Sequence, residues 1–76
     1  MKVSVLGTGC AKCDKLYRAV EEAIGELGLD AELEKVSGIQ EIMAFGVMMT
    51  PALAVDGEVK VAGKVPTNDE IKAMLS

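Results

Sequence analysis

The chain has 76 residues, a formal net charge of −4 from 8 basic and 12 acidic side chains, and 50% hydrophobic residues that include one Phe and one Tyr. This length suits one small domain, which we expect to span residues 1–76 around an aliphatic, methionine-filled core. The acidic balance excludes nucleic acid as an expected partner, and the most apolar region, residues 42–55, is too short and too broken by Thr50 and Pro51 for membrane insertion.

The first half of the chain reads as strand, helix and strand. Residues 2–6, KVSVL, predict a short buried strand, and the Gly-Thr-Gly at residues 7–9 predicts a loop. Apolar residues recur at helical spacing over residues 11–27, and Gly28 is well placed to cap that helix at its C-terminus. Residues 30–36, DAELEKV, alternate apolar and acidic side chains, which is typical of a strand with one buried face at or near a sheet edge.

The second half reads as a short helix, a hairpin and a final helix. Helical spacing resumes over residues 39–46. Residues 50–63, TPALAVDGEVKVAG, contain two strand-like runs joined by Asp56-Gly57, a strong hairpin signal. Residues 67–75, TNDEIKAML, open with a T-x-x-E capping box and predict a terminal helix.

This order of elements predicts an α/β fold, β-α-β-α-β-β-α, with a mixed four-stranded sheet flanked by three helices. The first strand, helix and second strand imply a right-handed crossover and a parallel pair, and the hairpin adds an antiparallel pair. Because the sequence shows no internal repeat, linker or low-complexity segment, we expect a single domain.

Both cysteines, Cys10 and Cys13, form a C-x-x-C motif where a loop enters the first predicted helix. Unpaired N–H groups and the helix dipole favour a thiolate there, and thiol pKa values in such motifs fall from about 8.5 to ~3.5–7.5. We therefore predict that Cys10 is the nucleophile and that Cys13, one turn deeper, is the resolving thiol. Lys12 adds a positive charge nearby.

Other uses of the cysteine pair are weighed against redox exchange. A structural disulfide closing about four residues would contribute only roughly 2 kcal/mol, and a structural zinc site wants four ligands whereas this chain has no histidine. Two thiolates do suit Cu(I), so a soft-metal binding domain stays open, as does a non-catalytic interaction module. We interpret Met48 and Met49 as core or as an apolar rim around the cysteines rather than as copper ligands.

Over essentially its full length the chain resembles the thioredoxin and glutaredoxin superfamily, specifically its smallest archaeal and bacterial redox-active disulfide members. The resemblance rests on GTGCAKC after the first strand, on TPALAVDGEVKVAG and on the terminal EIKAML. It implies a thioredoxin-like fold with a cis peptide bond at Pro51. It also implies that Thr50 lies in the substrate groove and that Gly63 leaves room for a partner backbone near Cys10.

The chain departs from both parent families at its motifs. Ala11-Lys12 replaces the Gly-Pro of a typical thioredoxin, and because this dipeptide helps tune the reduction potential, the potential cannot be transferred from either family. AGKVPTND replaces the Gly-Gly-x-Asp-Asp that helps glutaredoxins hold glutathione, which argues against glutathione as a partner. The heavy-metal-associated domain also has C-x-x-C after its first strand, but it normally carries G-M-x-C and ends on a strand.

The sequence thus predicts a thiol–disulfide oxidoreductase that acts on protein disulfides and is re-reduced by a flavin-dependent, thioredoxin-reductase-like donor. We expect no bound cofactor and no metal. Two cysteines and a start without a cationic and then apolar leader favour the cytoplasm. Apolar surface from Val47, Met48 and Phe45 is expected to form a partner-docking patch.

Overall fold

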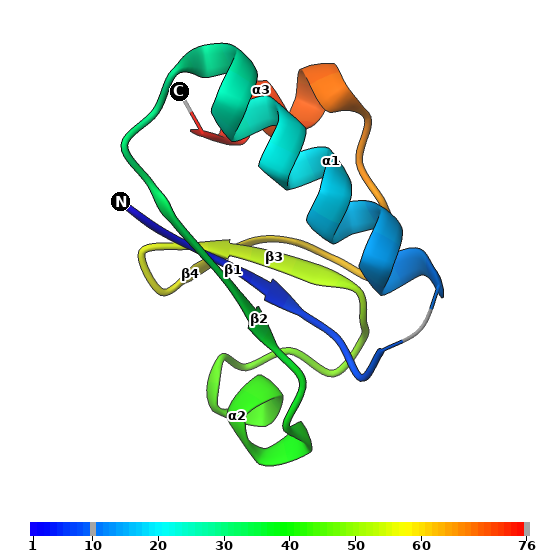
Figure 1. Cartoon of the computed structure of the whole chain (residues 1–76). Coiled ribbons are helices and arrows are strands. Elements are labelled where there is room, and N and C mark those ends of the chain that lie inside the picture. Colours follow the sequence, from blue (N-terminus) through cyan, green and yellow to red (C-terminus); the bar gives the residue numbers. More distant parts are fainter. Residues whose placement is uncertain (10, 76) are drawn as a thin grey trace.

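The computed structural model describes residues 1–9 and 11–75, and Cys10 and Ser76 lie outside the described residues. Within that part of the chain the elements follow the predicted order (Figure 1): β1 (Lys2–Leu6), α1 (Ala11–Leu27), β2 (Glu32–Val36), α2 (Ile39–Ala44), β3 (Ala52–Val55), β4 (Glu58–Ala62) and α3 (Asn68–Leu75). No helix among these is long and apolar enough to cross a membrane.

The strands form one mixed four-stranded sheet in the order β2-β1-β3-β4. β1 pairs with β2 in parallel and with β3 antiparallel, and β3 pairs with β4 antiparallel. The α/β fold with a mixed sheet is therefore confirmed, and β2 lies at an edge as its alternating pattern predicts. Asp56 and Gly57, with φ of 52° and 85°, make the left-handed two-residue turn between β3 and β4.

An irregularity in β4 divides two valines between the two faces of the sheet. Leu53 pairs with Val61 and Ala54 with Val59, so that Lys60 is an extra residue on β4. Because of this bulge, Val61 joins the buried cluster on one face while Val59 packs against the cluster on the other.

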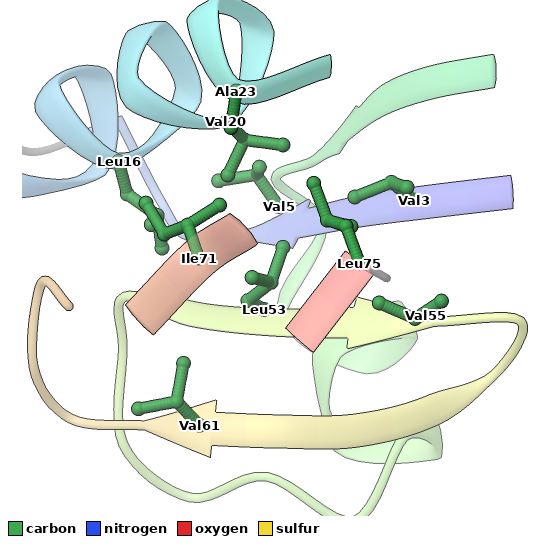
Figure 2. Close-up of a cluster of buried hydrophobic side chains, with 10 residues drawn as sticks. All are labelled: Val3, Val5, Leu16, Val20, Ala23, Leu53, Val55, Val61, Ile71 and Leu75. Carbon is green, nitrogen blue, oxygen red and sulfur yellow. The ribbon is translucent and has the colours of Figure 1, made fainter. Parts of the chain in front are cut away.

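Two hydrophobic clusters hold the helices to the sheet. α1 and α3 cover one face, where their side chains interlock with those of β1, β3 and β4 (Figures 1 and 2). This larger cluster contains Val3, Val5, Leu16, Val20, Ala23, Leu53, Val55, Val61, Ile71 and Leu75. α2 covers part of the opposite face, with a cluster of Leu6, Val36, Ile42, Val47 and Ala52.

The prediction of a methionine-filled core is wrong. Met1, Met43, Met48 and Met49 are exposed, and Met74 is a half-buried residue at the margin of the larger cluster. Branched aliphatic side chains fill the narrow space between sheet and helices instead, because they fit the pleated surface of a sheet well.

Local signals end the helices. Gly28, with φ of 65°, follows α1, and Leu29 N–H donates to Ile24 O at 3.1 Å, which is the bond of a Schellman cap. α2 ends at Ala44, earlier than the spacing suggests, and Gly46 with φ of 82° turns the chain out of the helix.

The predicted capping box begins α3. Glu70 N–H donates to Thr67 Oγ1 at 3.2 Å, and Thr67 N–H donates to Glu70 Oε1 at 3.1 Å. The backbone hydrogen bond from Thr67, helped by its hydroxyl and by Lys64, lowers the pKa of Glu70. Farther along the helix, a hydrogen bond to Glu26 of α1 raises the pKa of Lys72.

Candidate active site

The topology brings three loops together at one end of the sheet. Leu6, the last residue of β1, lies opposite Ala52, the first residue of β3, and Ala52 lies opposite Ala62, the last residue of β4. The loop from β1 into α1, the segment leading into β3 and the turn after β4 therefore converge (Figure 1). These loops and the first turn of α1 carry the described residues among those that the sequence predicts for the site.

Cys13 lies on the first turn of α1, fully buried, and is disulfide-bonded. No cysteine in the described part of the chain is free. Cys10, the predicted nucleophile, lies outside the described residues. Ala11 and Lys12, between the two cysteines, are exposed on the same turn.

The backbone of Gly7 lies directly against the sulfur of Cys13. A Cβ atom at Gly7 would stand 2.2 Å from Cys13 Sγ, a distance that no side chain can occupy. Gly7 N–H donates to Val36 O at 2.9 Å, which continues the β1–β2 pairing beyond the strands and fixes the glycine in place. The sequence alone marks Gly7 only as a loop residue, because only the folded chain brings it against Cys13.

The Thr50–Pro51 peptide bond is cis, as the resemblance implies. Pro51 is fully buried and Thr50 half-buried. Gly63, with φ of 81°, donates its N–H to Pro51 O at 2.9 Å. This hydrogen bond joins the end of β4 to the beginning of β3 beside the site.

The side chain of Met49 covers Gly63. A Cβ atom at Gly63 would lie 3.0 Å from Met49 Cε and 3.5 Å from Met49 Sδ. Met49 is nonetheless 63% exposed, so it lies across the surface rather than in the core. The space that the glycine leaves is therefore filled by the chain's own thioether.

An apolar groove of about 300 Å³ opens beside these loops. None of its lining residues is charged; they are Thr8, Ile39, Ile42, Met43, Val47, Met48 and Thr50. Ile39 and Met43 are each 66% exposed and Met48 is 99% exposed, so three large apolar side chains on the groove face solvent.

The residues expected to form an exposed apolar patch are only partly exposed. Met48 is exposed, but Val47 is buried and Phe45 packs against the cluster beneath α2, so both are largely structural. Ile39 and Met43 supply the exposed surface instead. Their spacing, four residues apart on a helix, indicates a shared face, but only the fold shows that this face is uncovered.

Polar groups near Cys13 are on the surface. Asp14 Oδ1 accepts a hydrogen bond from Lys35 Nζ at 3.0 Å, which joins α1 to β2. Within the described residues Ser4 is the only polar residue that is buried as a whole, and its Oγ donates to Glu34 Oε1 at 2.9 Å. No group of three or more His, Cys, Asp or Glu residues in the described chain could hold a metal ion.

Comparison with known proteins gives consistent matches along the whole chain. Residues 1–76 match a family model described as a thioredoxin domain. A protein named thioredoxin from Methanothermobacter thermautotrophicus is 47% identical over 76 residues, covering 100% of this chain and 99% of that protein. Another protein named thioredoxin, from Methanocaldococcus jannaschii, is 42% identical over 73 residues, covering 96% of this chain and 84% of that protein.

Proposed function

The chain belongs to the thioredoxin domain family and is a thioredoxin-like thiol–disulfide oxidoreductase; from that premise we propose that Cys10 and Cys13 exchange dithiol for disulfide with protein partners. The observation that carries the proposal is the position of Cys13. It is disulfide-bonded and fully buried on the first turn of α1, where the loops leading to Pro51 and Gly63 converge.

In the proposed reaction, the Cys10 thiolate attacks one sulfur of a partner disulfide. A bond forms between that sulfur and Cys10, and the other partner sulfur leaves as a thiolate that takes up a proton. The thiolate of Cys13 then attacks Cys10 Sγ, which forms the Cys10–Cys13 disulfide and releases the second partner thiolate. Two electrons pass from this chain to the partner, whose disulfide becomes a dithiol.

The surroundings of Cys13 support these roles. A fully buried sulfur is poorly placed to meet an outside disulfide first, but it is well placed to resolve one already held at the neighbouring cysteine. The N-terminal dipole of α1 favours a thiolate in its first turn, where Lys12 adds an exposed cation and Ala11 adds no polar group.

We propose further that an extended partner segment binds beside Thr50, Pro51 and Gly63 once the exposed side chain of Met49 moves off the glycine, with apolar side chains in the groove between Thr8 and α2. Thiol donors of the thioredoxin-reductase class in the cytoplasm would return the disulfide to the dithiol, with no bound cofactor in the exchange. Glutathione is not the proposed partner.

Replacing the resolving thiol tests the mechanism. Cys13→Ser is expected to leave partners covalently held on Cys10, because no second sulfur remains to release them. The variant is reduced, freed of reductant and mixed with a disulfide-bonded protein such as insulin, and mixed disulfides are detected by mass. Cys10→Ser is the matched control. Partners held by the Cys10→Ser variant instead would show that the two roles are reversed, and the absence of adducts in both variants would contradict the proposal.

A pair of substitutions on α2 tests the groove. Met43→Gln makes an exposed groove residue polar, whereas Ala44→Gln places the same side chain on the next, exposed position of the helix outside the groove lining. We expect the first to slow exchange with insulin several-fold and the second to leave it unchanged. Unfolding free energies of both should stay within about 0.5 kcal/mol of the parent. Equal rates for the two variants would show that α2 does not contact the partner.

A further inference from the structure

Charges on the exposed face of α1 are segregated along the helix. Residues 11–18, next to the cysteine motif, carry three cations and one carboxylate, whereas residues 19–27 carry three carboxylates and no cation. The cations are Lys12, Lys15 and Arg18, here called the basic stripe, and all three are exposed. Their spacing of three residues makes them neighbours on the helix surface.

Ion pairs strengthen this segregation at the end near Cys13. The carboxylate of Asp14 is neutralised by Lys35 at 3.0 Å. Within the described residues none of the three cations of the basic stripe forms an ion pair. Lys64, which follows Gly63, is paired with Glu70 at 3.7 Å. Glu41 belongs to α2, which lies on the face of the sheet opposite to α1.

Helix stability does not explain this order. The helix dipole favours carboxylates in the first turn and cations in the last, at about 0.3–1 kcal/mol for each terminal charge. In α1 the first turn carries Lys12 as well as Asp14, and the last turn carries no basic residue but carries Glu26, which is paired with Lys72 of α3. Charges placed against a local rule point to a function outside the helix.

Lys12 and Lys15, near the cysteine motif, act as charges separate from Glu26 at the other end of α1 in physiological salt, whereas Arg18 lies within one turn of Glu21 and Glu22. A helix of 17 residues is roughly 25 Å long, whereas the Debye length is about 8 Å. The basic stripe therefore attracts acidic groups near the cysteine motif even though the whole chain carries a net charge of −4.

We propose that the basic stripe docks the acidic surface that surrounds the disulfide of the protein partner, so that partners with carboxylates beside their cysteines react fastest. This inference rests on the proposed function and adds a partner class to it. A protein is the occupant rather than a nucleic acid because the stripe adjoins a thiol site, which needs a sulfur partner, and because carboxylates at the far end of the same helix would repel a phosphate backbone.

Three synthetic peptides provide the test. Each is closed by one disulfide, and the residues beside its cysteines are Glu in the first peptide, Lys in the second and Gln in the third. The reduced protein is mixed with each peptide and quenched with acid, and disulfide transfer is followed by mass. At low salt we expect the Glu peptide to react at least about tenfold faster than the Lys peptide, with the gap closing near 1 M salt, where the Debye length is about 3 Å.

Two variants with the same change in net charge separate the stripe from the overall field. Lys15→Gln with Arg18→Gln is expected to slow the Glu peptide about five- to tenfold. Lys2→Gln with Lys60→Gln, on the strands, is expected to leave its rate within about twofold. The Gln peptide should react alike with all three proteins.

The inference is overturned if the wild-type protein prefers the Lys peptide, as its net charge alone would dictate, or if both double variants lose the same preference. If a single-stranded oligonucleotide inhibits disulfide exchange with the Gln peptide and a polyglutamate peptide does not, the basic stripe binds nucleic acid and the inference is also overturned. No transfer to the Gln peptide by any protein would instead mean that the proposed function has failed.

Discussion

The contact between Gly7 and Cys13 yields a quantitative prediction. In Gly7→Ala the new Cβ would stand 2.2 Å from Cys13 Sγ, whereas non-bonded heavy atoms settle at about 3.5–4.0 Å. Neither neighbour gives way easily, because the sulfur is buried in a disulfide and Gly7 is held by its 2.9 Å hydrogen bond to Val36. Overpacking of this kind costs about 1–3 kcal/mol, and we expect a loss of about 2 kcal/mol in the oxidised protein.

In the reduced protein, the Cys13 thiol regains freedom to rotate, so we expect a loss of about 1 kcal/mol for the same variant. The difference of about 1 kcal/mol favours the dithiol and raises the reduction potential by about 20 mV for a two-electron couple. Urea unfolding of both redox forms measures the two losses, and equilibration in graded thiol buffers measures the potential.

Gly25→Ala is the matched control for this prediction. Gly25 lies within α1 and a Cβ atom there would meet nothing within 4 Å, so alanine should stabilise both redox forms by about 0.5–1 kcal/mol and leave the potential unchanged. The reasoning would be refuted by an oxidised Gly7→Ala protein within about 0.5 kcal/mol of the parent, or by a shift of the potential to a more negative value.

Two further predictions concern the site rim and α3. Gly63→Ala places a side chain at φ of 81° and 3.0 Å from Met49 Cε, so urea unfolding should show a loss of about 1–2 kcal/mol, partly restored by adding Met49→Ala. Gly9→Ala, at φ of 94° in open space, reports the conformational cost alone, and an equal loss there would mean that the Met49 contact costs nothing. Because hydrogen bonds from Thr67 lower the pKa of Glu70 below its ordinary 4.5, the stability that this carboxylate contributes is present above pH 4.5 and is lost as the pH falls through the lower folded value. The stability difference between the parent and Glu70→Gln should therefore narrow on acidification, and a constant difference down to about pH 2 would contradict this assignment.

Those parts of the fold that depend on neighbours in sequence were predictable. The Asp56-Gly57 turn and the capping box of Thr67 and Glu70 form between residues close in sequence, so those residues alone predict them. Helical spacing in α1 identifies its buried face, whereas alternation in β2 identifies only the face of Leu33, and Val36 is buried on the other face. The element order then restricts the sheet to few topologies. The C-x-x-C position at the start of α1 follows from the same local pattern.

Features that depend on long-range packing were not predictable. The extra residue Lys60 changes which face Val59 occupies, and no pattern in GEVKVAG marks it. The scarcity of aromatic residues suggested that methionines fill the core, whereas Met43 lies on the side of α2 away from the buried Ile42 and Met48 lies in the segment after that helix, both exposed. Exposure of an apolar side chain is a property of what the rest of the chain leaves uncovered.

The buried part of the site acts on the reduction potential, whereas its exposed charges act on the rate at which a partner associates. The Gly7–Cys13 contact involves a fully buried sulfur, so a change there alters the relative stability of the oxidised and reduced protein and must shift the reduction potential by the same free energy. Lys15 and Arg18 are exposed and touch no described carboxylate. Their replacement therefore changes the association rate of a partner, and it does not change the stability of the oxidised protein relative to the reduced protein. A substitution in the basic stripe that moved the potential by as much as Gly7→Ala would show that the stripe acts on the thiols themselves rather than on the partner.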